Sequence, residues 1–416
     1  MECNVLNERA DAVVMLTWSD WFTELRSNRY HYATRFAKLL PVIFVQPDLD
    51  KNTYSFEATS IPNITVLHIS KDYNARQNNQ LIKALLEKNI HRPILWIYNI
   101  NFYKFISNTT SVLTIYHGTE DYLSPQSQLR LTGLSPKKMN RILDKCDLLI
   151  NVSEGVAKSF AEYSTYKGRS ITVANGCDYK FYTPLLHNTE NKHPLPSKPI
   201  AFYQGNIFNK LNYELLYTLA SNMQDWQFRF CGKIVFTQDE GWEKLRTLKN
   251  VVYLGVLTPE EIRDESYKAT AGIIPFTLTD WLIKRSFPLK AFEYLATGLP
   301  VVTVPIDALL SFSDVLLFAE TADEFERALH KAQALRLDQD HLTLRLETSA
   351  KQDYDLRFEQ ALLVINQEID SKKAQTNATP YTLRVELLSN LLSHFIKLSR
   401  RYTPLSLKKT IKQFIF

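Results

Sequence analysis

Cysteine and long apolar runs are scarce in this sequence of 416 residues. The four cysteines, Cys3, Cys146, Cys177 and Cys231, show no close pairing, which argues against a disulfide framework or a zinc site. No apolar run reaches the roughly 18 residues that a transmembrane helix needs, so we expect no such helix. The first ten residues are polar and carry two glutamates, so we expect no signal peptide either. These absences predict a cytoplasmic protein with reduced thiols.

Basic charge is concentrated near the C-terminal end. The formal net charge is +5, but residues 381–416 hold seven basic residues against one glutamate, which leaves the rest of the chain at −1. Leucines and Phe395 recur in the same segment at helical spacing, so we predict a basic amphipathic helical tail. Such a helix can lie on an anionic membrane surface, or it can pack on the body or on a second subunit. The sequence leaves these alternatives open.

The order of predicted elements indicates an α/β fold with two domains. A chain of this length exceeds one ordinary core. Short β-rich runs alternate with helical patterns in both halves, which is typical of parallel sheets built from βαβ units. We predict two doubly wound, Rossmann-like domains that face across a cleft, at residues 1–181 and 199–350. Residues 182–198 are polar with three prolines and read as a linker. Residues 351–370 form a late helix, and residues 371–416 form a connector and the tail.

The individual strands and helices are expected as follows. Strands are predicted at 11–17, 41–46, 63–69, 93–98, 112–116, 147–151, 170–174, 199–204, 227–231, 251–254, 272–275, 301–304 and 315–318. Helices are predicted at 29–39, 80–88, 136–145, 154–163, 213–222, 259–268, 288–297, 322–335 and 354–369. Residues 277–286 are read as a loop.

The most informative segment runs from Phe287 to Val302. Pro288 suits a first helical turn, because its fixed φ fits there and its missing N–H is not needed. Gly298 and Pro300 end that helix, and an apolar run after them reads as a buried strand. Lys290 and Glu293 lie on this helix. A helix start with a nearby lysine attracts anions, and a carboxylate one turn deeper can accept hydrogen bonds from sugar hydroxyls.

This segment, FPLKAFEYLATGLPVV, resembles the donor site of GT-B glycosyltransferases, especially the large retaining class called group 1 or family 4. The resemblance covers roughly residues 11–370. It implies that Ser286, Phe287, Pro288, Leu289 and Lys290 hold a donor diphosphate and that Glu293 holds the ribose. It also implies a mechanism without a metal ion or other cofactor, in which Lys290, Glu293 and His117 are the catalytic candidates. Residues 351–370 would then be the helix that crosses back to the first domain.

Further donor-site candidates follow the strands of the second half. Gly205 ends a predicted strand and Lys210 follows in its loop, a pattern that allows close approach of a phosphate. Gly232 ends the next strand and, by the resemblance, lies beside the nucleotide base. Relatives carry an acidic residue eight positions before the helix glutamate, but this chain has Arg285 there. Arg285 could bind the diphosphate or an anionic sugar group, or it could be a surface residue.

Candidates for the acceptor side lie in the first half. His117 directly follows a predicted strand, where an open α/β sheet presents residues to its cleft. A histidine there can hydrogen-bond a sugar hydroxyl or transfer a proton. Glu120 and Asp121 follow in the same loop, although Asp121 could equally cap a helix. Asp20 and Arg29 come from the loop after the first strand. A structural role is the alternative for each of them.

The sequence therefore predicts a glycosyltransferase that moves a sugar from a nucleotide-diphosphate sugar to a glycan or lipid-linked acceptor, with bacterial envelope polysaccharide as the destination. No nucleic-acid partner is expected. The chain would act in the cytoplasm or at the inner face of the membrane. Two alternatives stay open, a nucleotide-sugar epimerase and a non-catalytic GT-B binding subunit. The arginine at position 285 is the feature that keeps the second alternative open.

Overall fold

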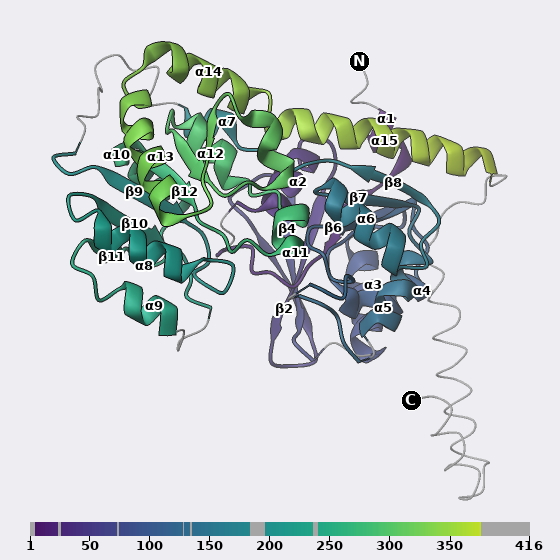
Figure 1. The fold of residues 1–416 in the computed structure, drawn as a ribbon. Helices are drawn as coiled ribbons and strands as arrows, with labels where there is room; N and C mark the ends of the chain where they lie inside the picture. The colour runs from purple at the N-terminus through teal and green to yellow at the C-terminus, as the bar shows by residue number, and fades with distance from the viewer. Residues whose placement is uncertain are drawn as a thin grey trace, which may run out of the picture.

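The computed structural model describes residues 5–23, 26–72, 75–127, 129–133, 135–183, 196–235 and 240–375. Most of the expected linker 182–198 and the whole expected tail 381–416 lie outside the described residues. The described chain forms two α/β lobes, each with its own sheet (Figure 1). The expected fold class, two doubly wound domains with parallel sheets, is confirmed.

The first sheet has the strand order β3-β4-β2-β1-β5-β6-β7-β8. Every neighbouring pair is parallel except β3 with β4. The strands are β1 (Ala12–Leu16), β2 (Val42–Leu49), β3 (Tyr54–Ala58), β4 (Ile64–Ser70), β5 (Pro93–Ile97), β6 (Leu113–Gly118), β7 (Leu148–Asn151) and β8 (Arg169–Thr172). The strand order reverses at β1, between β2 and β5. Ligands of such sheets bind at a reversal of this kind, beyond the carboxyl ends of the strands.

The second sheet is wholly parallel, in the order β11-β10-β9-β12-β13-β14. Its strands are β9 (Ile200–Gln204), β10 (Gln227–Cys231), β11 (Val251–Tyr253), β12 (Ala271–Ile274), β13 (Val301–Thr303) and β14 (Leu316–Phe318). The central strands β9, β12 and β13 are buried throughout, as expected for a sheet covered on both faces. The strand order reverses here at β9, between β10 and β12.

Helices cover both sheets. In the first domain they are α1 (Val5–Arg9), α2 (Asn28–Phe36), α3 (Ala75–Glu87), η1 (Ile100–Phe102), α4 (Tyr103–Asn108), α5 (Ser135–Leu143), α6 (Glu154–Tyr163) and α7 (Tyr179–Tyr182). In the second part they are α8 (Tyr213–Asn222), α9 (Glu240–Leu245), α10 (Pro259–Lys268), α11 (Asp280–Arg285), α12 (Lys290–Ala296), η2 (Asp307–Phe312), α13 (Ala322–Leu335), α14 (Gln339–Ala350) and α15 (Tyr354–Gln375).

Several expected boundaries differ from the structure, and three of them bear on the site. Residues 277–286 contain a helix, α11, because the Thr279 hydroxyl caps it by accepting the Leu282 N–H. The helix expected from Pro288 begins at Lys290, with Leu289 as its N-cap, so Pro288 precedes the first helical residue. Tyr182, placed in the linker, is the last residue of α7 and packs in the core of the second domain.

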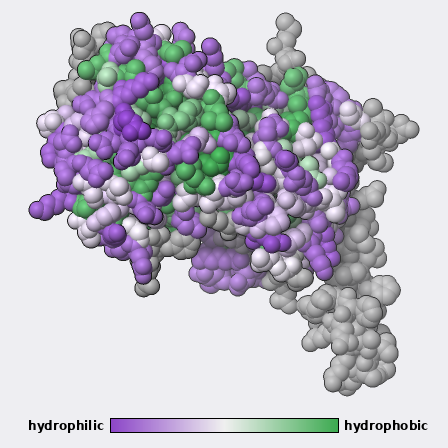
Figure 2. Space-filling view, viewed as in Figure 1, coloured by the Kyte–Doolittle hydropathy of each residue, from purple (hydrophilic) through white to green (hydrophobic). Residues whose placement is uncertain are grey.

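The long helix α15 runs across the top of the molecule and lies against the first domain (Figure 1). Its residues Tyr354, Phe358, Ala361, Ile365 and Ile369 are buried in the same core cluster as the first sheet. The chain therefore returns to the first domain after completing the second. Figure 2 shows a mostly hydrophilic surface whose apolar patches gather mainly on the lobe of the second domain.

Candidate active site

The strand ends of the two sheets place the expected site residues at the seam between the lobes. Gly205 follows β9, the strand at which the second sheet reverses, and Lys290 begins the helix between β12 and β13. His117 lies at the end of β6 in the first sheet. Their grouping at carboxyl strand ends is the arrangement in which doubly wound folds bind ligands.

Gly205 and Lys290 form the centre of the donor-side cluster. Gly205 has φ +127°, a conformation that residues with a side chain rarely adopt. A Cβ at this position would lie 2.5 Å from Lys290 Nζ, so the ammonium group sits directly over the glycine backbone. Lys290 Nζ also lies 4.1 Å from the centroid of the Tyr203 ring. Burial lowers the pKa of Lys290 below that of an ordinary lysine.

A second lysine adds to this positive charge. Lys210 follows Gly205 in the same loop and lies close enough to lower the pKa of Lys290 further by charge repulsion. Lys210 Nζ forms an ion pair with Glu120 of the first domain at 3.4 Å. Two positively charged lysines close to the backbone of a glycine form a favourable binding site for an anion. Glu120, expected on the acceptor side, instead balances part of this charge.

Glu293 lies one turn deeper in α12 and is 4% exposed. Its carboxylate accepts a hydrogen bond from the Gln204 amide and is also hydrogen-bonded to the Tyr182 hydroxyl. Burial raises the pKa of Glu293, and the Lys290 charge opposes that rise. A carboxylate has about four acceptor positions, so these contacts leave room for a ribose hydroxyl. Its expected role in binding the ribose stays a prediction.

The segment Ser286–Leu289 links α11 to α12 and is partly exposed along its length. Leu289, the N-cap of α12, has no side-chain capping hydrogen bond. The Phe287 carbonyl accepts a hydrogen bond at 3.1 Å from the Asn175 amide of the first domain. No side chain therefore caps the helix start, although the N–H groups of Ala291 and Phe292 donate to the Pro288 and Leu289 carbonyls.

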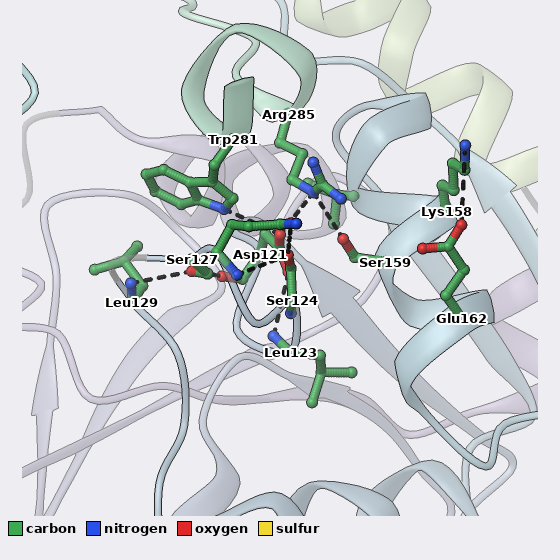
Figure 3. A network of polar contacts seen from close by, with 12 residues as sticks. Asp121, Leu123, Ser124, Ser127, Leu129, Lys158, Ser159, Glu162, Trp281 and Arg285 are labelled. Atoms are coloured by element: carbon green, nitrogen blue, oxygen red, sulfur yellow. Dashed lines mark hydrogen bonds and ion pairs between the residues drawn. The ribbon is translucent and has the colours of Figure 1, made fainter. Parts of the chain in front are cut away.

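Arg285 and Asp121, expected in two different sites, are paired with each other (Figure 3). Arg285 Nε lies 2.7 Å from Asp121 Oδ2, and Trp281 Nε1 donates to the same oxygen at 3.0 Å. Asp121 Oδ1 accepts the N–H groups of Leu123 and Ser124, so this residue closes a local turn and caps no helix. Both side chains thus have partners within the protein, and the diphosphate role expected for Arg285 and the acceptor role expected for Asp121 stay predictions.

His117 is 1% exposed and packs among aromatic rings. Its Nδ1 accepts the Trp96 indole N–H at 3.3 Å and lies 3.1 Å from the Tyr98 hydroxyl. The assigned tautomer therefore carries its proton on Nε2, which is buried and has no hydrogen-bond partner. Burial, aided by the positive charge of Arg29, lowers the pKa of His117 to about 3. His117 is thus a neutral donor, which argues against the proton-transfer role at neutral pH.

The remaining candidates divide by position. Arg29, on α2, lies near His117 and over the Tyr98 ring, 5.7 Å from its centroid. Asp20 is exposed, and its carboxylate accepts the Phe22 N–H in a local turn. Gly232 is buried, and a Cβ there would overlap the Gly205 carbonyl, so it supports the Gly205 loop. Arg29 and Gly232 therefore lie next to the candidate site, whereas Asp20 stabilises the loop to which it belongs.

A pocket of about 990 Å³ lies at the seam beside this cluster. Arg285 and Phe287 line it together with Ser153, Lys158 and Tyr163. Lys290, Glu293 and His117 are not among its lining residues. The residues that the sequence predicts for donor binding lie around Gly205, Lys290 and Glu293. We therefore place the candidate site there, and the pocket lies next to it.

Sequence reasoning missed several residues that organise the site: Tyr182, Gln204, Trp281, Ser153 and Asn175. Gln204 alone carried a usable signal, because it ends the strand that precedes Gly205. The others meet partners from distant segments. Tyr182 contacts Glu293 within the core of the second domain, and Trp281, Ser153 and Asn175 form contacts between the lobes.

The described residues show neither a metal-binding cluster nor a membrane-spanning helix. Within these ranges, no three His, Cys, Asp or Glu side chains gather closely enough to hold a metal ion. Nor does any described helix combine the length and the apolar character that crossing a bilayer requires.

A family model and a curated relative both indicate similarity to glycosyltransferases. Residues 198–334 match the family model described as glycosyl transferases group 1. The chain is 25% identical over 228 residues to TuaH of Bacillus subtilis (strain 168), whose name assigns it provisionally to teichuronic acid biosynthesis as a glycosyltransferase. That match covers 53% of this chain and 57% of the relative, so the chain spans just over half of the curated relative's length.

Solved structures share the fold at low identity. Sucrose-phosphate synthase from Thermosynechococcus elongatus has a TM-score of 0.65 and 14% identity, covering 87% of this chain and 100% of its own. HepE from Anabaena, solved in complex with UDP, has a TM-score of 0.61 and 11% identity, covering 86% of this chain and 99% of its own. At such identities the likeness shows the fold alone, which is the two-lobed architecture described above.

Proposed function

We propose that this chain, a GT-B-fold member of the glycosyltransferase group 1 class, transfers a sugar from a nucleoside-diphosphate sugar to a glycan or lipid-linked acceptor. The observation that carries this proposal is the position of Lys290 Nζ directly over the Gly205 backbone, with Lys210 nearby. The provisional role in the name of TuaH supports an acceptor in envelope polysaccharide synthesis. Action in the cytoplasm, with residues 381–416 on a membrane surface, belongs to the same proposal.

The proposed mechanism stabilises the leaving diphosphate by electrostatics. Negative charge develops on the diphosphate as its bond to the sugar breaks. Lys290 and Lys210 offer positive charge at one place, beside the backbone of Gly205. Because these groups are already fixed in the folded protein, little reorganisation accompanies the reaction. This arrangement supports a mechanism that does not depend on a metal ion.

His117 would orient the sugar or the acceptor through its Nε2–H group. A buried donor without a partner has a free energy penalty that a ligand oxygen can relieve. The strongly lowered pKa of His117 keeps it neutral through the physiological range, so we assign it a hydrogen-bonding role. Retention of configuration at the anomeric carbon rests on the resemblance to the retaining class.

The central test is binding and turnover in a Lys290→Ala variant. A thermal-shift screen of the wild-type protein with UDP, GDP and ADP should reveal stabilisation by one of them. Lys290→Ala should reduce turnover of the matching nucleotide sugar more than tenfold, since one electrostatic donor to a transition state is worth about 10²-fold or more. Lys284→Ala is the matched control, because this lysine is exposed and its ammonium group pairs with Asp280 in its own helix.

The products distinguish the alternatives. A transferase releases free nucleoside diphosphate, an epimerase converts the sugar while it stays attached, and a binding subunit does neither. Wild-type turnover in Lys290→Ala, or absence of nucleotide binding in the wild-type protein, would overturn the proposal.

A further inference from the structure

Positive charge gathers on two neighbouring helices of the first domain, α4 and α5, outside the candidate site. Residues 129–145 carry five basic side chains against one acid, Asp144, although the chain before residue 381 has a net charge of −1. The helices pack side by side (Figure 1). Together they form what we call the basic face, which consists of Lys104 on α4, Lys137, Lys138 and Arg141 on α5, and Lys145 just after α5.

The cations of the basic face have no carboxylate partners in the described part of the chain. Within the described ranges none of the five forms an ion pair, whereas the exposed Lys158 and Lys284 each pair with an acid one turn away. The carboxylate of Asp144 instead accepts the Thr165 hydroxyl. All five cations except Lys138 are exposed. Exposed charge of one sign attracts a partner of the opposite sign, so the basic face suits an anionic surface.

An aromatic ring and a hollow lie among these cations. Lys138 Nζ and Arg141 Cζ each lie 5.7 Å from the centroid of the Tyr103 ring, within the range of a cation–π contact. A hollow of about 340 Å³ lies between α4 and α5. Lys104, Arg141 and Lys145 line it, together with hydroxyl and amide groups and one acid. Three positive charges against one negative charge suit a phosphate group at this place.

Apolar side chains occur in the loop that leads into α5. Leu129 is 36% exposed and precedes the exposed Arg130. Leu131 and Tyr103 are only partly buried against the core of the first domain. Basic residues mixed with leucines and an aromatic ring are typical of a surface that lies on a bilayer, because apolar groups enter the headgroup region while cations contact phosphates. A polyanion dissolved in water would contact the charges and leave the leucines exposed.

Both helices begin at the edge of the first sheet that bears the candidate site. The helix α4 follows β5, and α5 follows β6. These strands are parallel neighbours, and a connecting helix between parallel strands starts at the carboxyl end of the strand before it. His117 lies at the end of β6, and residues 119–134 lead from there to α5. The basic face therefore starts on the side of the sheet where the acceptor candidates lie.

We propose that the basic face binds the anionic phospholipid headgroups of a membrane surface. Phosphate groups pair with Lys104, Arg141 and Lys145 around the hollow, and Tyr103 and Leu129 lie at the depth of the headgroups. The bilayer then lies beside the acceptor side of the candidate site, where a lipid-linked acceptor would arrive. This contact is separate from the one proposed for residues 381–416, and it does not depend on the chemistry of the donor site.

Flotation of the full chain with lipid vesicles tests the contact. The probes are vesicles of phosphatidylcholine alone and vesicles of phosphatidylcholine and phosphatidylglycerol in equal amounts. We expect the wild-type protein to bind only the mixed vesicles and to be released at high salt. Lys104→Gln, Arg141→Gln and Lys145→Gln combined should lower the partition coefficient about 100-fold, since each basic residue near an anionic surface contributes about fivefold.

A matched control carries the same change in net charge elsewhere. It combines Lys249→Gln, Lys331→Gln and Lys351→Gln, three exposed lysines outside the first domain. Its partition coefficient should stay close to that of the wild-type protein, and both triple variants should melt near the wild-type temperature. Equal partition coefficients in the two triple variants would overturn the proposal, because net charge alone would then explain the binding.

Footprinting by lysine acetylation locates the contact in the wild-type protein. Mixed vesicles should slow the acetylation of Lys104 and Lys145 severalfold and leave that of Lys249 and Lys331 unchanged. Equal acetylation of Lys104 and Lys145 with and without vesicles, in protein that floats, would overturn the proposal and place the contact elsewhere in the chain. Absence of binding to the mixed vesicles would also overturn it, and binding to soluble dextran sulfate in that case would indicate a polyanionic glycan as the partner. Nucleotide binding is measured separately, so either proposal can fail without the other.

Discussion

Glu120 and Asp121 are adjacent in the sequence, and each forms an ion pair across the cleft, but the two pairs differ physically. Asp121 is fully buried and lies 2.7 Å from Arg285, whose side chain is 13% exposed. The Glu120 side chain is 40% exposed and lies 3.4 Å from Lys210. Asp121 has additional donors from its own loop and from Trp281.

The difference indicates two functions for neighbouring charges. A buried, multiply hydrogen-bonded pair is costly to separate, because each partner would be left charged without water. An exposed, single contact is weak and is easily exchanged. We therefore interpret Asp121–Arg285 as a contact that sets the geometry between the lobes. Glu120 would hold Lys210 only until a diphosphate replaces it.

The largest expected effect comes from breaking the buried pair. Asp121→Ala leaves Arg285 and Trp281 without their acceptor and should lower the free energy of unfolding by about 3 kcal/mol. Glu120→Ala should change it by less than about 1 kcal/mol. Urea denaturation followed by circular dichroism measures both variants. Equal losses would contradict the contrast between the two pairs.

Replacement of Lys210, whose ion pair with Glu120 is partly exposed, should reduce turnover and leave the stability of the fold nearly unchanged. Lys210→Ala should reduce turnover of the nucleotide sugar by about tenfold, since it removes one partly exposed charge from the diphosphate seat. Steady-state kinetics and a thermal melt measure the two properties separately. A large fall in melting temperature with normal turnover would show that Lys210 is structural.

The pH dependence of nucleotide binding should report on Lys290. Its pKa is lowered by burial, so its charge is lost at a lower pH than that of an exposed lysine. Nucleotide affinity should therefore fall severalfold as the pH rises from about 7 to 10. Lys290→Arg stays charged throughout and should remove this decline. Calorimetric titrations at several pH values measure it, and an unchanged decline in Lys290→Arg would assign the titration to another group.

The smallest expected effect comes from releasing Lys210. Glu120→Gln removes the competing carboxylate charge, so nucleotide affinity should rise, by up to about threefold for a surface pair. The gain should disappear at high salt, because exposed charges are screened. A loss of affinity would indicate that Glu120 itself contacts the ligand.

Local patterns predicted most strands and the presence of the helix that contains Lys290. The periodicity of apolar residues and helix capping both depend on residues a few positions apart. Two of the helices that were missed had signals of the same kind. Thr279 caps α11 and Asp338 caps α14. The edge strand β3 is short, exposed along much of its length and antiparallel, so its pattern is weak. Arg345 reads as a surface residue, but it is fully buried and donates to the Gly298 and Leu335 carbonyls.

The sequence by itself determined the two sheets, the glycine loop after β9 and the lysine that begins α12, since each depends on residues close in the chain. Only the tertiary structure decided that Arg285 pairs with Asp121, that Glu293 contacts Gln204 and Tyr182, and that His117 is buried and neutral. Charge and hydrogen-bonding capacity are visible in a sequence, but burial and partners are not. Both depend on how segments distant in the chain meet, within one domain for Glu293 and Gln204 and between the lobes for Arg285 and Ser153.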